Sequence, residues 1–130
     1  MGFHLGTRSR ERLDGVHTDL IIVFATAIQR TDIDFAVIEG LRTLERQKQL
    51  KASGASKTLK SRHLTGHAVD IAPYIGGEIR WDWPLYIQLA KPIKQAAKDC
   101  GITIEWGGDW KWADGPHWQL SWKSYPLKRS

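Results

Sequence analysis

Hydrophobic and polar positions along this chain follow helical spacing in some segments and strand-like spacing in others. Residues 20–29 are rich in apolar side chains and predict a helix packed into the core. Residues 44–52 are rich in Glu, Arg, Gln, Lys and Leu and stop before Gly54, which predicts a second helix with a glycine terminator. A third helix is expected over residues 84–100, where Pro92 indicates a kink or a later start.

Short apolar or β-branched runs predict the strands, and residues 1–13 read as an irregular or helical lead-in. The predicted strands are residues 35–39, 68–72 (closed by Pro73), 102–105 and 117–121. Because helices and strands are mixed without regular βαβ alternation, we expect an α+β fold with a mainly antiparallel sheet flanked by helices. A chain of 130 residues fits one domain over residues 1–130, without a separate cell-wall-binding domain.

Composition and charge narrow the possible functions. The chain is 42% hydrophobic, and 19 Lys and Arg against 14 Asp and Glu give a net charge of +5, which favours anionic partners. The basic residues are scattered, without a basic stripe or a recognition helix, so no nucleic-acid partner is expected. The single cysteine, Cys100, excludes an internal disulfide and a multi-cysteine zinc site, and we expect it to be a buried or half-buried thiol.

The apolar runs are too short for a membrane span. The longest, residues 20–28, falls well short of the roughly 20 residues that a spanning helix needs. The N-terminus also lacks the apolar run of a signal peptide. We therefore expect a protein that is made and folded in the cytoplasm and has no stable membrane insertion.

Two histidines and an aspartate form a candidate metal site. His63 precedes the strand that contains Asp70, and His117 begins the last predicted strand. A catalytic zinc ion takes about three imidazole or carboxylate ligands and keeps a position open for water. Gly66 would allow a tight turn that brings the first two side chains together. A histidine at a strand end is more often a satisfied surface or core residue, so spacing alone leaves both interpretations open. The remaining histidines are expected to be structural (His67) or on the surface (His4 and His17).

The motifs around these residues resemble the M15 family of zinc peptidases, and most of all the phage endolysins that are L-alanyl-D-glutamate peptidases. The resemblance spans residues 14–120 and rests on a combination of short motifs. They are Ser61-x-His63-x-x-Gly66-x-Ala68-x-Asp70, Glu105-Trp-Gly-Gly-Asp-Trp110, Asp114-x-Pro-His117, and Gly40-Leu-Arg42-Thr43 with Gln47. The resemblance implies the small α+β fold of Hedgehog-type and D-Ala-D-Ala peptidases, with Zn²⁺ held by His63, Asp70 and His117.

The same resemblance implies roles for further residues. Asp114 matches a catalytic acidic position, and Glu105 matches a second acid that orients groups or shares the proton. Arg42 matches an arginine that stabilises the substrate carbonyl or its oxyanion, although a salt bridge to Glu39 or Glu45 is the alternative interpretation. Ser61 is expected to hydrogen-bond a neighbour or the substrate rather than to act as a nucleophile. Trp110 and Trp112 are expected to line a groove for sugar and stem peptide.

The function implied is hydrolysis of the L-Ala–D-Glu bond of bacterial peptidoglycan, causing cell lysis. The alternatives are a DD- or LD-carboxypeptidase of the same family, or a zinc-bearing wall-binding domain without turnover. Peptidoglycan is the expected partner, and the protein is expected to act as a monomer. A lysis enzyme of this kind would stay in the host cytoplasm until a membrane pore releases it to the cell wall.

Overall fold

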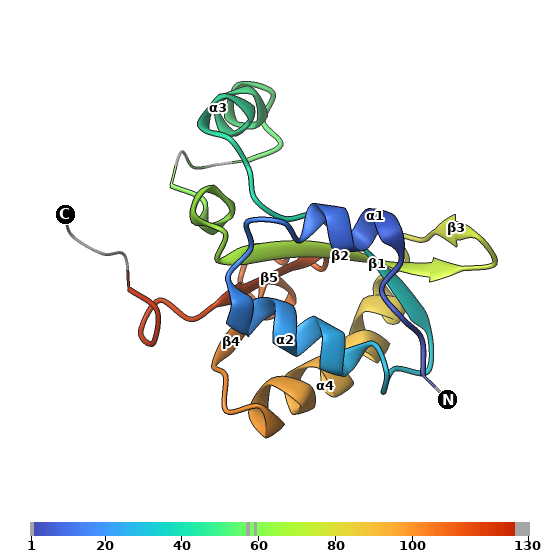
Figure 1. The fold of residues 1–130 in the computed structure, drawn as a ribbon. Coiled ribbons are helices and arrows are strands. Elements are labelled where there is room, and N and C mark those ends of the chain that lie inside the picture. The colour runs from blue at the N-terminus through green and yellow to red at the C-terminus, as the bar shows by residue number, and fades with distance from the viewer. Residues whose placement is uncertain (1, 57, 59, 127–130) are drawn as a thin grey trace.

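The computed structural model describes residues 2–56, 58 and 60–126 as helices, strands and connecting turns (Figure 1). The α-helices are α1 (Thr7–Arg12), α2 (Thr18–Ala27), α3 (Leu44–Ala52) and α4 (Trp83–Asp99), and the 3-10 turns are η1 (Arg62–Thr65) and η2 (Gly107–Asp109). The strands are β1 (Asp34–Glu39), β2 (Ala68–Ile75), β3 (Glu78–Ile79), β4 (Ile104–Trp106) and β5 (His117–Leu120). The predicted helices and strands are therefore present, with ends that match or are shifted by up to three residues.

The strands form one sheet in the order β1-β2-β5-β4, with β3 pairing to the end of β2. All the strand pairs are antiparallel, which confirms the predicted fold class. The prediction that Pro73 ends the second strand is wrong, since β2 continues to Ile75. The Pro73 carbonyl accepts a hydrogen bond from the Arg80 N–H, on the β3 side. The missing N–H would point to that same side, away from β1, so the β1–β2 pairing loses nothing there.

The two faces of the sheet have different roles. Helices α2 and α4 lie side by side on one face (Figure 1) and build the core with strand residues such as Val69, Ile71 and Trp118. Trp118 is 1% exposed, and its ring meets the Phe24 ring edge-on with centroids 6.4 Å apart. Because side chains alternate along a strand, Asp70, His117 and Gln119 point to the opposite face, away from α2 and α4.

Helix α1 protects the free edge of β1. The Ser9 hydroxyl accepts a hydrogen bond from the Val37 N–H at 3.0 Å, and the Arg12 guanidinium donates to the Val37 carbonyl at 2.9 Å. These side chains satisfy backbone groups that an exposed edge strand would leave open. Helix α3 instead projects from the body of the molecule, beyond the sheet (Figure 1).

Helix α4 differs from the sequence prediction at both ends. It begins at Trp83 and continues through Pro92, so the later start suggested by that proline is wrong. Cys100 is exposed, which contradicts the expectation of a buried or half-buried thiol. The buried face of α4 runs through Ile93, Ala96 and Ala97, but Cys100 lies past the last helical residue. Its Sγ lies 3.7 Å from Thr26 Oγ1 on α2 and is exposed at the edge of the contact between the two helices.

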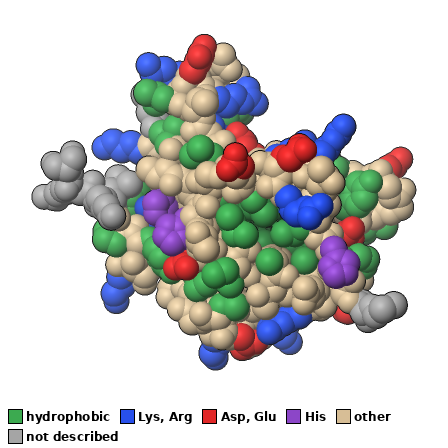
Figure 2. Space-filling model, viewed as in Figure 1, with side chains coloured by type: hydrophobic (Ala, Val, Ile, Leu, Met, Phe, Trp, Pro, Cys, Tyr) green, Lys and Arg blue, Asp and Glu red, His purple; other side chains and the backbone are tan. Residues whose placement is uncertain are grey.

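Charged side chains of both signs are interspersed on the face shown in Figure 2, in agreement with the scattered charge of the sequence. Within the described residues, no helix is both long enough and apolar enough to cross a lipid bilayer.

Candidate metal centre and groove

The sheet and the η1 turn bring the predicted metal ligands together. Asp70 on β2 is the direct partner of His117 on β5 in the antiparallel register. The Asp70 Oδ1 atom lies 3.1 Å from His63 Nε2 and 3.2 Å from His117 Nδ1. One potential ligand atom from each of the three side chains lies within 4.8 Å of the others. The geometry therefore makes His63, Asp70 and His117 a possible metal-binding triad.

The η1 turn fixes the position of His63, which is 1% exposed. The Ser61 hydroxyl accepts a hydrogen bond from the His63 N–H at 3.2 Å, as expected for a neighbour-bonding serine. Gly66 ends the turn with φ of +74°, and a Cβ there would lie 2.3 Å from the Gly15 carbonyl oxygen. Only glycine fits both conditions, which confirms the predicted tight turn.

The donor set of the triad suits a cation. A carbonyl oxygen can only accept, so His63 Nδ1–H donates to Gly40 O at 2.8 Å and leaves the Nε2 lone pair facing Asp70. His117 Nε2 lies 2.8 Å from Gln119 Oε1, so its Nδ1 lone pair faces the same carboxylate. Two imidazole lone pairs and a carboxylate oxygen thus converge on one point, and two nitrogens with one oxygen are ligands that zinc accepts.

The titration behaviour of the triad reflects these contacts. Burial disfavours the charged form of Asp70, but in the form that has protons on the His117 and His63 nitrogens facing it, their hydrogen bonds and positive charges hold the pKa of Asp70 well below the usual range. Burial lowers the pKa of His117, yet the hydrogen bond and the charge of Asp70 raise it overall. Asp70 therefore stays ionised and available as a ligand.

The sequence left two interpretations of Arg42 open, a salt bridge and a place at the catalytic site, and its contacts fit both. Its guanidinium makes a bidentate pair with the Glu39 carboxylate, with both N–O distances at 2.7 Å. Its Nη1 donates to Gln47 Oε1 at 2.7 Å, and its Nη2 lies 3.8 Å from Asp70 Oδ2. The salt bridge to Glu39 is thus present, and the same side chain borders the triad. A catalytic role for Arg42 stays a prediction.

Asp114 lies on the loop that leads into β5. Its backbone is held by a hydrogen bond from Asp114 N–H to Gly107 O at 2.8 Å, and its carbonyl accepts from the His117 N–H at 3.2 Å. Desolvation and the negative charge of Asp70 raise the pKa of Asp114, against the positive side chains around the triad. Among the described residues its carboxylate has no hydrogen-bond partner, so it is free to hold or pass a proton.

Glu105 is connected to the triad through a residue that the sequence analysis missed. Glu105 on β4 faces Gln119 on β5 in the register, and Gln119 Nε2 donates to Glu105 Oε2 at 2.9 Å. Gln119 is two residues after His117, so strand alternation puts both on one face and could have indicated the contact. The catalytic role predicted for Glu105 stays a prediction.

A groove of about 880 Å³ contains the triad and all the other predicted site residues. Trp110 and Trp112 line it as predicted, and the Trp110 ring centroid lies 5.1 Å from that of His117. Trp122 adds a further indole, and Arg62 lies beneath it at 3.9 Å from the ring centroid. Arg62 is 2% exposed, and its Nη2 donates to the carbonyls of three C-terminal residues, which are Leu120, Ser121 and Tyr125.

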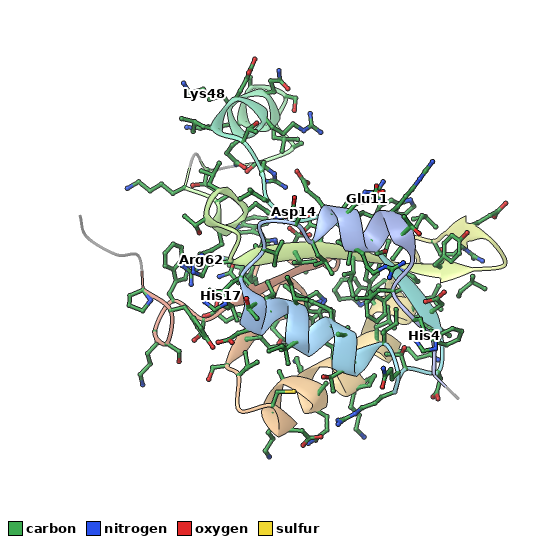
Figure 3. All side chains as sticks on the ribbon, in the orientation of Figure 1. His4, Glu11, Asp14, His17, Lys48 and Arg62 are labelled. Carbon is green, nitrogen blue, oxygen red and sulfur yellow. The ribbon has the colours of Figure 1, made fainter. Side chains whose placement is uncertain are left out.

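The remaining histidines lie outside the triad. His4 is exposed, at the opposite end of the molecule from His17 and Arg62 (Figure 3). His17 is half-buried rather than fully on the surface, because its Nδ1 accepts from the Asp19 N–H and caps α2. His67 has the structural role expected for it, bonding Thr65 Oγ1 at 2.7 Å with its ring 5.3 Å from that of His17.

Comparison with known proteins identifies the family. The sequence model of the phage L-alanyl-D-glutamate peptidase family matches residues 1–121. The chain belongs to this family. It is 34% identical to the L-alanyl-D-glutamate peptidase of Escherichia phage T5, over 96% of this chain and 94% of that protein. It is also 39% identical to the L-alanyl-D-glutamate peptidase of Listeria phage A118, over 72% of this chain and 32% of that protein.

The fold agrees with this assignment. A crystal structure of the L-Ala D-Glu endopeptidase ChiX of Serratia marcescens matches 97% of this chain with a TM-score of 0.91 and 46% sequence identity, and 96% of that chain is covered. The resemblance found in the sequence, the peptidase class and the fold class are therefore confirmed. The residue roles and the identity of the metal are taken up below.

Proposed function

We propose that this chain is a zinc-dependent peptidoglycan endopeptidase that hydrolyses the L-Ala–D-Glu bond of the stem peptide. The observation that supports it best is the triad of His63, Asp70 and His117, whose inward lone pairs meet beside the unpartnered Asp114 carboxylate in an open groove. The names of the Escherichia phage T5 and Serratia proteins supply the bond to be tested.

The triad would hold the zinc ion, with the ring nitrogens and the carboxylate oxygen named above as ligands. When bound there, zinc would supply a Lewis acid and lower the pKa of a ligated water toward about 7. The buried setting of His63 and His117, at 1% and 7% exposure, would keep the ligand geometry fixed during the reaction.

The chain's own residues then divide the proton and charge transfers. A carboxylate oxygen of Asp114 accepts a proton from the attacking water and delivers it to the amine nitrogen of D-Glu as the bond to L-Ala breaks. The raised pKa of Asp114 favours holding that proton between the two steps. Arg42, fixed in plane by Glu39, presents positive charge to the carbonyl oxygen of L-Ala as it becomes negative.

The groove favours an endopeptidase over a carboxypeptidase. The aromatic lining suits a longer substrate that lies across the site. The presence of Asp114 beside the triad argues against a wall-binding domain without turnover.

Digestion of purified peptidoglycan, followed by mass spectrometry of the fragments, tests the proposal. We expect new L-Ala carboxyl ends and new D-Glu amino ends, with metal analysis showing about one zinc ion per chain. The His63→Ala variant serves as the inactive control. Release of D-Ala alone would instead assign a carboxypeptidase, and a protein that binds peptidoglycan without producing fragments would be a binding domain.

Access to this substrate needs a route across the host membrane. The cell wall lies outside it, and no described helix could span it. We propose that the enzyme stays in the host cytoplasm as a monomer until a pore made by another protein releases it. We expect protein added from outside to lyse cells whose peptidoglycan is exposed, and protein expressed inside cells that lack the pore to cause no lysis. This pair of results would support the proposed order of events.

A further inference from the structure

The His117 imidazole lies between two acceptor side chains. Its Nδ1 is 3.2 Å from Asp70 Oδ1 and its Nε2 is 2.8 Å from Gln119 Oε1. A neutral imidazole has hydrogen on only one ring nitrogen. His117 can act as a ligand through Nδ1 only if the hydrogen is on Nε2, where it donates to Gln119. The partner of Nε2 thus decides whether the ligand lone pair is present.

The orientation of the Gln119 amide depends in turn on Glu105. An amide could present either its oxygen or its NH₂ group to His117, and the two ends have nearly the same size. The other end of Gln119 meets Glu105 Oε2 at 2.9 Å. An ionised carboxylate only accepts, so the NH₂ group must face Glu105 and the oxygen must face His117. Glu105 therefore fixes the direction of the hydrogen bonds.

The sheet holds these side chains in one row. Asp70 is paired with His117 across β2 and β5, and Glu105 is paired with Gln119 across β5 and β4. Side chains of directly paired residues lie on the same face of a sheet, and His117 and Gln119 share that face by alternation. Gln119 is 4% exposed, so water does not compete freely for its amide.

We propose that Gln119, oriented by Glu105, is the positioning residue that keeps His117 in its metal-binding tautomer. The inference rests on the proposed metal function of the same triad. His63 has no comparable dependence on a side chain, because its Nδ1–H donates to the Gly40 backbone carbonyl, which cannot be reversed. The second hydrogen bond of a ligand histidine fixes its tautomer and its ring orientation.

The chain offers a set of substitutions that separates polarity from packing. Gln119→Leu removes the acceptor and should weaken zinc binding about 10- to 100-fold. Glu105→Gln lets the Gln119 amide reverse, and we expect a smaller loss. The double change Glu105→Gln with Gln119→Glu restores the direction, because the new carboxylate accepts from both His117 Nε2–H and the new amide. A carboxylate is the stronger acceptor, so zinc affinity should return at least to that of the unmodified protein.

The test is titration of the metal-free proteins with zinc, in competition with a chromophoric chelator, and with cobalt, whose absorption spectrum reports ligand geometry. Thermal unfolding of each metal-free protein is the fold control, and Gln88→Leu, an exposed glutamine on α4, is the matched substitution. Loss in both single variants and recovery in the double variant would support the inference. Recovery is not expected if Gln119 only fills space.

The outcomes separate this inference from the proposed function. If the unmodified chain binds no zinc, both the proposed function and this inference are wrong. If it binds zinc and Gln119→Leu binds equally well with the same cobalt spectrum, only the inference fails. If Gln119→Leu does not fold without metal, the double variant decides. A zinc affinity of the double variant as low as that of Glu105→Gln alone would show that the hydrogen-bond direction at residue 119 does not control zinc binding, and the inference would be wrong.

Discussion

Asp70 and His117 are directly paired across strands β2 and β5, and a single carboxylate oxygen of Asp70 approaches both His117 and His63. This oxygen lies 3.2 Å from His117 Nδ1 and 3.1 Å from His63 Nε2. Asp70 is therefore the centre of the triad, and its removal should affect both imidazoles at once.

We expect Asp70→Ala to lose bound zinc and, with it, peptidoglycan hydrolysis. Removing one of three protein ligands leaves too few donors for a catalytic site. Zinc per chain, measured by atomic emission after dialysis, should fall to about a tenth or less of the unmodified value. Asp99→Ala, which removes an exposed carboxylate that is paired with Arg30, is the control. Retained zinc together with full hydrolysis would end the ligand assignment.

Asp114→Asn should keep the zinc and the fold but lose turnover. The amide has nearly the same shape but cannot accept the proton of the attacking water, and loss of a general base lowers kcat by about 10²- to 10⁴-fold. Fragment release by mass spectrometry gives the rate, and metal analysis together with circular dichroism gives the control values. If the rate survived this change, Glu105 would become the candidate base.

Gly66→Ala should destabilise the η1 turn more than the same change at Gly76. Both glycines have positive φ, +74° and +63°, so an alanine at either position would cost about 1–2 kcal/mol for the left-handed backbone conformation. Only the Gly66 position would also press its Cβ against a backbone oxygen, at 2.3 Å, whereas Gly76 has open space around it. Chemical denaturation should show the larger loss for Gly66→Ala. Equal losses of unfolding free energy in the two variants would mean that the η1 turn shifts to accommodate the Cβ at no extra cost.

Gln47→Leu should loosen α3 without unfolding the sheet. Gln47 is 0% exposed, and its amide bonds Arg42 Nη1, the Ser56 hydroxyl and the Thr58 carbonyl. Loss of these buried bonds costs about 1–3 kcal/mol, and we expect it to appear locally, as faster amide exchange over residues 44–52. Gln49→Leu, an exposed change on the same helix, is the control. Unchanged exchange in α3 would show that other contacts hold the helix.

Tyr86→Phe should change the alkaline stability of the protein. Burial, with the charges of Asp70 and Asp114, raises the pKa of Tyr86 from 10.0 to about 12. Folding therefore favours the neutral phenol. The raised pKa adds to the free energy of unfolding. This stabilisation is fully present below pH 10 and is lost as the pH rises toward 12, because the phenol of the unfolded chain releases its proton first. Denaturation curves between pH 9 and about 12 should fall less steeply for the variant.

The same change has a second consequence at neutral pH. The Tyr86 hydroxyl is buried and has no hydrogen-bond partner among the described residues. Replacing an unsatisfied buried hydroxyl by hydrogen should leave the free energy of unfolding unchanged or raise it by about 1 kcal/mol. A clear loss of stability at pH 7 would show that the hydroxyl has a partner, such as a water molecule.

The sequence predicted much of the local structure for physical reasons that act over short distances. Apolar spacing marked α2 and the central strands, while Gly54 marked the end of a helix and Gly66 marked a tight turn, and both glycines have a positive φ. The grouping of His63, Asp70 and His117 was expected from the family resemblance, whereas their spacing alone left both interpretations open, and their role as metal ligands stays a prediction. Local rules failed at Pro73 and Cys100, where the partner strand and the extent of the core decided the outcome.

Only the tertiary structure decided which partner each site residue has. The sequence left Arg42 between catalysis and a salt bridge, and the fold gives it Glu39, Gln47 and a place beside Asp70. Strand alternation could have placed Gln119 on the same face as His117, but nothing in the sequence indicated that Glu105 faces Gln119 across β4 and β5. Such contacts depend on the register between strands that are distant in sequence, and register is set by packing of the whole sheet rather than by any one segment.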